Sequence, residues 1–368
     1  MQVDRIVVVG CGSIGRRHAR VLASREDVAL ELCEPLPENL DRARTEVGKV
    51  PVHRSFEDML RTSPQMVIIA TPHSVHAEQT VAALQAGAHV LCEKPMSDTV
   101  AGAQRMLHQA SQCNRVLDVG FTLRFHPALL HIKQLIDSGE LGRILHIHWH
   151  VGTYQTLLNS VSRHQSSTFG ALMMDYSHQP DLINWWLGTT PTQVYASGCF
   201  GEHLPLVSRP NVLAVTLQFE QPTIATIGLN YVQQPERCSC EVIGDRAWVL
   251  LDMKKGLLVH GRREDDSISE RLFNFERDEL FRAEHEAFIN ATRGIRPVES
   301  PPEKAIKSMY VVEAAITSLQ TGTPISLSAE CELKEEELVK PSSLQDEPTA
   351  SFTSPQPSPG RKNAKGQA

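Results

Sequence analysis

Short runs of β-branched and other apolar residues alternate with amphipathic stretches through the first third of the chain. The candidate strands lie at residues 5–9, 29–33, 65–70, 89–92 and 115–120. Between them, segments such as HAEQTVAALQAG place apolar residues at helical spacing and end in a glycine. Strands that alternate with helices in this way form a parallel sheet covered by helices. The pattern therefore predicts a doubly wound α/β domain over residues 1–122.

After residue 122 the pattern changes to longer strand-like runs, among them ILHIHWHVGTY, NVLAVTLQFE and TIATIGLNYV. Several runs are joined by short turns, which is typical of an antiparallel or mixed sheet. Two helical segments follow, at about residues 277–293 and 302–320. We therefore expect a second, α+β domain over residues 123–330, with an open and mostly antiparallel sheet that serves substrate binding and oligomerisation.

Composition narrows the classes of partner. The net charge is −7 and the chain has no strong basic block, so nucleic acid is not an expected partner. No segment reaches the roughly 20 apolar residues of a membrane helix, and the start MQVDRIVVVG lacks an export pattern, so we expect a cytoplasmic protein without membrane contact. Residues 331–368 are rich in Pro, Ser, Glu and Lys, which predicts a disordered tail.

Metal sites have weak support in the sequence. The eight cysteines are spread through the chain and several lie in strand-like runs, which favours reduced thiols. Cys238 and Cys240 form a C-x-C without a second pair nearby, so structural zinc is disfavoured. Histidines recur at short spacing without alternating carboxylates, at His146, His148 and His150 and at His73 and His76. We expect no metal.

A glycine-rich turn follows the first candidate strand. The segment Gly10-Cys11-Gly12-Ser13-Ile14-Gly15 fits G-x-G-x-x-G and opens a helix. The first glycine permits the tight turn, the second lets backbone amides reach a pyrophosphate, and the third brings helix and strand together. The first domain is therefore predicted to be a Rossmann dinucleotide-binding domain. Its expected cofactor contacts in this turn are Gly10, Gly12, Ser13, Ile14 and Gly15.

Glu34 is expected at the end of the second strand, 19 residues after Gly15. A carboxylate there can accept hydrogen bonds from the adenosine ribose hydroxyls and would repel a 2′-phosphate. No Arg or Lys stands beside it in Glu34-Pro35-Leu36-Pro37, so we predict NAD over NADP. The carboxyl end of the 65–70 strand, where ligands collect in open α/β sheets, adds the expected cofactor contacts Thr71, Pro72, His73 and His76.

Longer motifs resemble one family, in order along residues 5–326. They are the E-K-P of LCEKP with the preceding ATPHSVHAEQTVAALQAGAHV, the inter-domain VGFTLRFHPALLHIKQLIDSGELGRI, and FGALMMDYSHQPDLINWWLG. These segments resemble the Gfo/Idh/MocA oxidoreductases. The resemblance implies an NAD-dependent dehydrogenase acting on CH-OH groups, which interconverts a secondary alcohol and a ketone on a sugar, nucleotide sugar or cyclitol. It also implies a homodimer or homotetramer.

The resemblance places Lys94 beside the nicotinamide and the substrate hydroxyl, and gives His178 the proton transfer. A neutral imidazole can accept the hydroxyl proton while an ammonium stabilises developing alkoxide charge. Glu93, in the same E-K-P, is an expected cofactor contact. Asp175 and Asp181 flank His178 at three residues on either side, so on a helix one of them could orient the ring. Asp175 is therefore included among the catalytic candidates.

The sequence indicates the substrate-binding residues less clearly than the cofactor-binding ones. D-Y-S-H-Q-P-D resembles members with D-L-S-H-E-L-D, associated with acylated and nucleotide-activated sugars, but Phe169-Gly170-Ala171 replaces that subgroup's glycine run and leaves the pocket shape open. Arg124 could bind substrate oxygens or a phosphate, or form a domain-bridging ion pair. The remaining substrate-binding candidates are Tyr154, Arg163 and His164, from a segment that resembles the family's substrate loop, and Asp181.

Two other functions remain open at this point. Some relatives use transient NAD-linked oxidation to cleave a glycosidic bond and recycle the cofactor. Related folds also include sensors or regulators that bind the dinucleotide without turnover. The presence of both Lys94 and His178 counts against a sensor.

Overall fold

The computed structural model describes residues 3–159, 165, 168–201, 203–204, 206 and 208–327. Two predicted substrate residues, Arg163 and His164, and the predicted tail at 331–368 lie outside the described residues. Within the described part, no helix combines the length and the apolar character that crossing a bilayer requires.

The first sheet is parallel, with the strand order β3-β2-β1-β4-β5-β6. Its strands are β1 (Asp4–Val9), β2 (Val28–Cys33), β3 (Val52–His53), β4 (Met66–Ile69), β5 (His89–Glu93) and β6 (Leu117–Gly120). This order reverses direction between β1 and β4, and ligands of doubly wound sheets bind at the carboxyl ends of the strands at such a point. The predicted Rossmann fold is confirmed.

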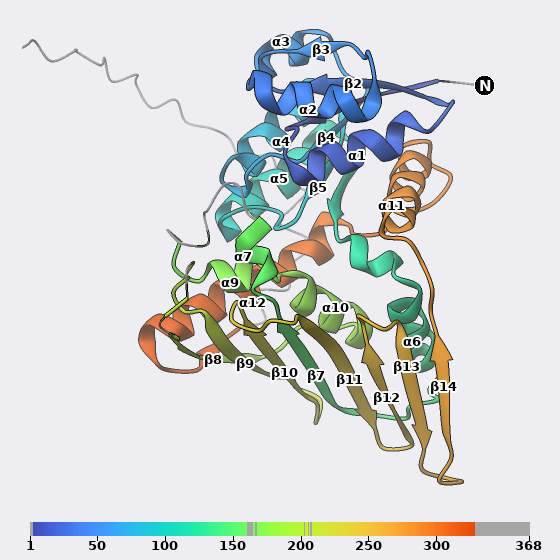
Figure 1. Cartoon of the computed structure of the whole chain (residues 1–368), viewed down its shortest axis with the longest axis vertical. Helices are drawn as coiled ribbons and strands as arrows, with labels where there is room; N and C mark the ends of the chain where they lie inside the picture. Colours follow the sequence, from blue (N-terminus) through green and yellow to red (C-terminus); the bar gives the residue numbers. More distant parts are fainter. Residues whose placement is uncertain are drawn as a thin grey trace, which may run out of the picture. The chain divides into compact units, whose positions relative to one another are not determined.

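Helices cover both faces of this sheet (Figure 1). They are α1 (Ser13–Ala23), α2 (Pro37–Val47), α3 (Phe56–Arg61), α4 (His76–Gln85) and α5 (Val100–Cys113). The β1, β2 and β4 strands are apolar on both sides because α1 and α2 pack on one face while α4 and α5 pack on the other. A 3-10 turn, η1 (His73–Val75), connects β4 to α4.

The second sheet has nine strands in the order β14-β13-β12-β11-β7-β10-β9-β8-β15. Within this sheet, β7 and β10 are the one parallel pair among the described strands, so the predicted mostly antiparallel sheet is confirmed. Its strands are β7 (Ile144–Gly152), β8 (Gln193–Cys199), β9 (Val212–Gln218), β10 (Ile224–Asn230), β11 (Arg237–Gly244), β12 (Ala247–Asp252), β13 (Leu257–Arg262), β14 (Ile268–Leu272) and β15 (Ile325–Ser326).

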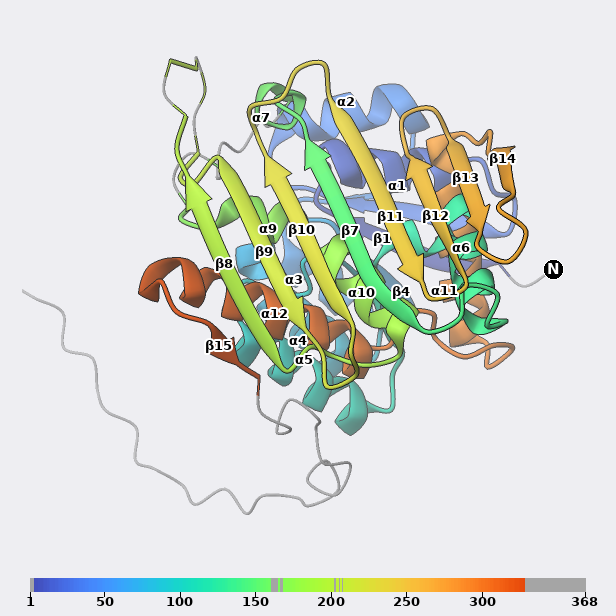
Figure 2. The ribbon, with the colours of Figure 1, turned by 90° about the horizontal axis from the view of Figure 1, so that it is seen from below.

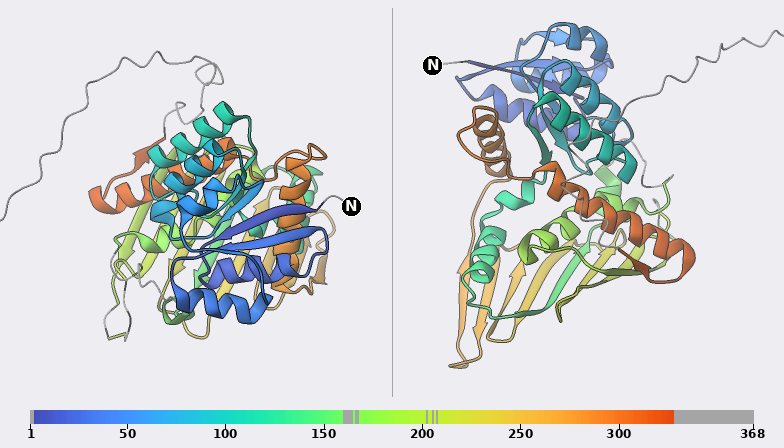
Figure 3. Two further views of the ribbon diagram at one scale, coloured as in Figure 1. Left: turned by 90° about the horizontal axis from the view of Figure 1, so that it is seen from above. Right: turned by 180° about the vertical axis from the view of Figure 1, so that it is seen from behind.

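One face of this sheet carries the core. The apolar sides of its strands pack against α6 (Pro127–Asp137), α9 (Ala171–Asp175), α10 (His178–Leu187) and α12 (Pro302–Thr321), as Figures 1 and 3 show. The short α7 (Gln155–Asn159) follows β7, and the turn η2 (Thr122–Phe125) links β6 to α6. Trp149 of β7 stacks on Trp186 of α10 with ring centroids 5.8 Å apart, which fixes α10 against the middle of the sheet.

Among the described residues, no helix covers the other face of the nine-stranded sheet (Figure 2). Large apolar side chains are exposed there at alternate strand positions, including Tyr195, Ile224 and Leu250. The histidine row of β7 lies among these positions and bonds within the sheet: His146 and His148 both contact the hydroxyl of Thr226. A homodimer or homotetramer formed through this face stays a prediction.

The last helices return to the first sheet. Phe288 and Ile289 of α11 (Arg277–Thr292) join the core on the α1 side, and Ala305 and Ile306 of α12 join the core on the α5 side. The predicted boundary near residue 122 lies between the two sheets, but these helices contribute to the first sheet's core as well. The domain limits therefore stay a prediction.

Candidate active site

The glycine turn after β1 has the shape that a pyrophosphate needs. Gly10 has a φ of +89°, and a Cβ there would stand 2.8 Å from the carbonyl oxygen of Ala70. A Cβ on Gly15 would lie 1.7 Å from the Gly10 oxygen, so only glycine allows α1 to start this close to the turn. A Cβ on Gly12, by contrast, would meet no described atom within 4 Å. The space beside Gly12 therefore admits a ligand.

The backbone and side chains around this turn fit a dinucleotide. Gly12 caps α1 without a side-chain hydrogen bond, so the positive end of the helix faces the open space, with Ser13 exposed at the first turn and Ile14 half-buried. Glu34, immediately after β2, is 5% exposed and accepts hydrogen bonds from the backbone amides of Cys11 (2.7 Å) and Leu36 (3.0 Å). Its carboxylate is thus fixed beside the turn, while its predicted contact with the adenosine ribose stays a prediction.

The loop after β4 lies next to the glycine turn at the direction change of the sheet. Thr71 donates its hydroxyl to Gln79 of α4, and Pro72 and His73 continue into η1. His76, at the start of α4, is 1% exposed, and each of its ring nitrogens lies 2.9 Å from a backbone carbonyl oxygen. Its ring nitrogens are therefore engaged by the chain itself. Among the described residues, no cluster of His, Cys, Asp and Glu could hold a metal ion.

Lys94 reaches from the end of β5 to the start of the second sheet's helices. Its Nζ donates to the carbonyl oxygen of Asp175 at 2.8 Å, and its backbone amide donates to Glu93 at 3.0 Å. The carboxylate of Asp175 accepts hydrogen bonds from the Tyr231 hydroxyl and, at 3.0 Å, from Gln165. Lys94 and Asp175, which the sequence placed in one site, are in direct contact.

His178 begins α10 and lies within electrostatic reach of Lys94. Burial lowers its pKa well below the ordinary value, and the charges of Lys94, Arg277 and Arg124 lower it further. The ring is therefore neutral at pH 7 and able to accept a proton. Its Nδ1 is buried and has no hydrogen-bond partner among the described residues, while the ring packs edge-on against Phe121. A neutral imidazole keeps one nitrogen lone pair, which suits a proton acceptor.

Glu93 is held by a chain of buried polar groups. Its Oε1 lies 3.0 Å from His18 Nε2, and His18 Nδ1 lies 2.7 Å from His285 Nε2. Burial by itself raises the pKa of Glu93, but the hydrogen bond from His18 and the charge of Lys94 outweigh burial and lower it. Glu284 lies nearby, and burial together with the charge of Glu93 raises its pKa well above the ordinary value. The anionic form of Glu93 is thus favoured, and its charge in turn disfavours the charged form of Glu284.

Arg124 and Asp181 form a buried ion pair. Two guanidinium nitrogens of Arg124 donate to the two Asp181 oxygens at 2.9 and 2.7 Å, and a third donates to the carbonyl oxygen of Glu299. Both side chains are at most 2% exposed. Arg124 and Asp181 both belong to the predicted second domain, so this ion pair lies within that domain, and a contact of Arg124 with substrate stays a prediction. Asp181 binds Arg124, so it does not orient the His178 ring as one of the sequence alternatives held.

The other substrate candidates are only partly described. Tyr154 is 7% exposed, and its hydroxyl accepts a hydrogen bond from the Leu206 amide at 3.0 Å. Phe169, next to Gly170, is exposed. Sequence reasoning missed Tyr231, Gln165 and His18. No motif distinguishes any of the three from its neighbours in the sequence. Only the position of His18 on the buried face of α1, one turn after Gly15, offered a signal.

Two family profiles match the chain, one over the first sheet and one over the second. The profile described as "Oxidoreductase family, NAD-binding Rossmann fold" matches residues 5–121. The profile described as "Oxidoreductase family, C-terminal alpha/beta domain" matches residues 133–327. Both carry the name Gfo/Idh/MocA.

Individual relatives agree with these profiles. The chain is 34% identical over 198 residues to inositol 2-dehydrogenase of Streptomyces avermitilis, covering 52% of this chain and 56% of that protein. It is 30% identical over 187 residues to inositol 2-dehydrogenase of Salmonella typhimurium, covering 49% and 53%. The matches thus span about half the length of these relatives.

A solved structure shares the fold. The scyllo-inositol dehydrogenase from Lactobacillus casei with bound NAD(H) and scyllo-inositol superposes with a TM-score of 0.76 at 24% identity. The match covers 88% of this chain and 99% of that chain.

Proposed function

The chain belongs to the Gfo/Idh/MocA oxidoreductase family with an NAD-binding Rossmann fold, and on this premise we propose that it interconverts a secondary alcohol and a ketone on a cyclitol or sugar-like polyol. The observation that carries the proposal is the pairing of Lys94 with the segment that bears His178. Inositol dehydrogenases among the relatives favour a cyclitol as the first substrate to test. Cytoplasmic location stays a prediction.

The residues around the glycine turn would hold the cofactor. The amides at the start of α1 would bind the pyrophosphate beside Gly12, and Glu34 would accept hydrogen bonds from the adenosine ribose. Bound NAD supplies the acceptor for the hydride that leaves the alcohol carbon. The loop from Thr71 to His73 stands at the carboxyl end of β4, so its residues would also contact the bound dinucleotide.

Lys94 and His178 have different roles at the substrate hydroxyl. His178 takes the hydroxyl proton, because its lowered pKa keeps a ring nitrogen free to accept at neutral pH. The Lys94 ammonium stabilises the negative charge that develops on the oxygen as the carbon–oxygen double bond forms. In the reverse direction, His178 returns the proton to the oxygen. Asp175 positions Lys94 through its carbonyl oxygen.

Replacing Lys94 by Ala tests this assignment. The change removes the positive charge next to the reacting oxygen, so kcat is expected to fall by about 10²- to 10³-fold while the affinity for NADH changes little. Steady-state kinetics and NADH fluorescence titration measure the two quantities. Lys255→Ala, in an exposed turn after β12, is the matched control. Turnover of the Lys94 variant close to that of the parent protein would disprove the role.

A substrate panel tests the reaction class. Purified protein with NAD is followed for NADH absorbance across myo-inositol, scyllo-inositol, simple sugars, nucleotide sugars and aryl glycosides. Net NADH with a polyol or sugar supports the proposal. Release of the aryl group without NADH accumulation identifies a glycosidase with a recycled cofactor, and NADH binding without turnover on any member identifies a sensor.

A further inference from the structure

His76 makes two polar contacts that the reaction just proposed does not use. Its Nδ1 lies 2.9 Å from the carbonyl oxygen of Pro95, and its Nε2 lies 2.9 Å from the carbonyl oxygen of Thr71. Both separations are ordinary hydrogen-bond lengths, and a carbonyl oxygen can only accept. Both ring nitrogens must therefore carry a proton for both bonds to form.

A neutral ring does not satisfy this arrangement. Neutral imidazole has one N–H, so one nitrogen lone pair would face a carbonyl oxygen at 2.9 Å inside a site that is 1% exposed. Such an unsatisfied contact is costly when water is excluded. Burial on its own lowers the pKa of His76, but Cys92 of β5 and the two carbonyls outweigh burial and raise it to about 9.

The two carbonyls belong to neighbouring loops of the cofactor site. Thr71 precedes Pro72 and His73 after β4, and Pro95 directly follows Lys94 after β5. Since β4 and β5 are paired strands, the ring spans two adjacent loops at the carboxyl edge of the sheet. A displacement of Pro95 would therefore be transmitted to Lys94 within one residue.

We propose that His76 is a positioning residue, a buried imidazolium that clasps the loop after β4 to the Lys94–Pro95 turn. Through Pro95 it sets where the Lys94 ammonium stands, and through Thr71 it holds the loop that faces the cofactor. The clasp rests on the proposed function of Lys94. It assigns His76 a role in arranging the site, without contact to substrate.

The protonation state is tested directly. The full-length chain is labelled with ¹⁵N-histidine, and the ring nitrogens are observed by NMR at pH 7.0, with His76 assigned by its disappearance in His76→Gln. Two protonated nitrogens are expected at pH 7.0, and one should lose its proton only at higher pH. If either ring nitrogen of His76 lacks a proton at pH 7.0, the proposed imidazolium is disproved.

Two conservative variants separate the two bonds. An Asn amide can replace Nδ1 and keep the bond to Pro95, whereas a Gln amide can replace Nε2 and keep the bond to Thr71. His76→Gln is therefore expected to lower kcat by about tenfold to a hundredfold with near-normal NADH affinity, because Lys94 loses its anchor. His76→Asn is expected to keep most of kcat and to bind NADH more weakly. Turnover is measured with the panel member that gives the fastest NADH formation, starting from myo-inositol.

Thermal denaturation and a control complete the design. His108→Gln, on the exposed side of α5, is the control and should change neither kcat nor the affinity for NADH. Equal losses of kcat and NADH affinity in both His76 variants, in proportion to their melting temperatures, would indicate a purely structural residue and overturn the positioning role. If Lys94→Ala keeps normal turnover, the proposed function fails, and the NMR measurement still decides the state of His76.

Discussion

At the scale of single residues, the chemistry of the site depends on what surrounds each group. His178 carries an ordinary imidazole, yet burial and three nearby cations hold its pKa far below the usual value. Glu93, which is also shielded from solvent, stays an anion because His18 and Lys94 stabilise its charge. Both pKa values are lowered, and this leaves the histidine neutral and able to accept a proton while the glutamate stays charged.

The lowered pKa of His178 predicts the acid limb of the pH profile. His178 must be neutral to accept a proton, and its neutral form persists well below pH 6.5. The kcat/KM for alcohol oxidation should therefore stay flat as pH falls from 7.5 to 6.0. In Lys94→Met the limb should move to higher pH, because one of the charges that lowers the pKa is gone. An acid limb at or above pH 6.5 in the parent protein would contradict a neutral His178.

Glu34 predicts the choice of dinucleotide. Its carboxylate is fixed by the Cys11 and Leu36 amides, so it cannot easily turn away from a 2′-phosphate. We expect a higher kcat/KM with NAD than with NADP, and Glu34→Gln should reduce that ratio by about tenfold as the repulsion is removed. Glu38→Gln, exposed in the first turn of α2, is the control. An NADP preference in the parent protein would refute the assignment.

At the scale of elements, the turn between β1 and α1 shows three glycines with different tasks. Gly10 and Gly15 are required by the chain itself, since a Cβ on either would meet backbone atoms at 2.8 Å or less. Gly12 is open on the side where a Cβ would point. The same residue type therefore serves folding at two positions and leaves room for a ligand at the third.

This difference gives a paired prediction. Gly12→Ala should leave the free energy of unfolding nearly unchanged but weaken NADH binding by about tenfold or more, equivalent to about 1.4 kcal/mol. Gly15→Ala should instead lower the free energy of unfolding by about 1 to 3 kcal/mol, because α1 must move away from the Gly10 carbonyl. Urea denaturation and NADH titration distinguish the two. Equal loss of stability in both variants would contradict the open space at Gly12.

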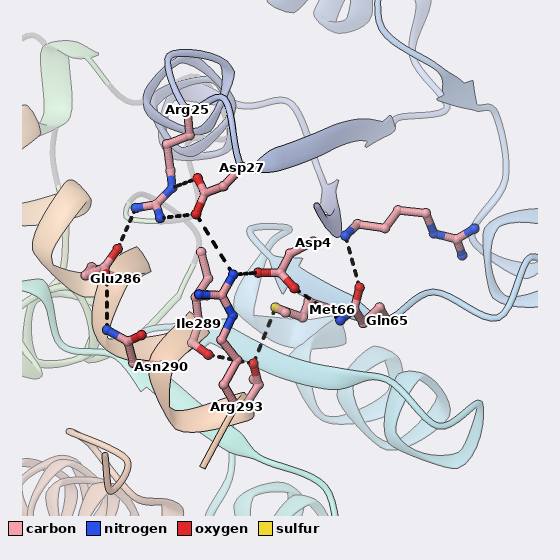
Figure 4. Close-up of polar contacts among 11 residues, drawn as sticks. Asp4, Arg25, Asp27, Gln65, Met66, Glu286, Ile289, Asn290 and Arg293 are labelled. Carbon is pink, nitrogen blue, oxygen red and sulfur yellow. Dashed lines mark hydrogen bonds and ion pairs between the residues drawn. The ribbon is translucent and has the colours of Figure 1, made fainter. Parts of the chain in front are cut away.

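At the scale of the whole molecule, helix α11 ties the C-terminal sequence to the first strand. Arg293 Nη2 lies 2.5 Å from the carboxylate of Asp4 and also contacts Asp27, which pairs with Arg25 (Figure 4). Arg25 in turn contacts Glu286 of α11. Asp4 is fully buried, so its charge depends on Arg293 and on the Gln65 amide, 3.3 Å away.

Removing this link should destabilise the protein. Arg293→Ala leaves the buried Asp4 carboxylate without its cation, and we expect the free energy of unfolding to fall by about 1 to 3 kcal/mol. Urea denaturation measures the change. Arg296→Ala, which breaks a more exposed pair with Glu299, should cost much less. Equal effects of the two substitutions would show that the Asp4 link contributes little.

The sequence predicted the fold class well because local patterns determine it. The candidate strands 5–9, 29–33 and 89–92 match β1, β2 and β5 within a residue at each end, since buried parallel strands are continuous apolar runs. The short β3, two residues long, has no such run and was missed. The return of α11 and α12 to the first sheet could not be read from periodicity, which reports which face is apolar but not what covers it.

For the candidate site, the sequence by itself determined the phosphate turn, the acidic residue after β2, and the identity of Lys94 and His178 as candidates. The turn and the acidic residue depend on residue type and short spacing, whereas Lys94 and His178 became candidates through the resemblance to the Gfo/Idh/MocA family. Only the tertiary structure decided that Asp181 binds Arg124, that Asp175 meets Lys94 through its carbonyl oxygen, and which groups surround His76. Such pairings join residues distant along the chain, and their charges depend on burial, which only the packed fold fixes.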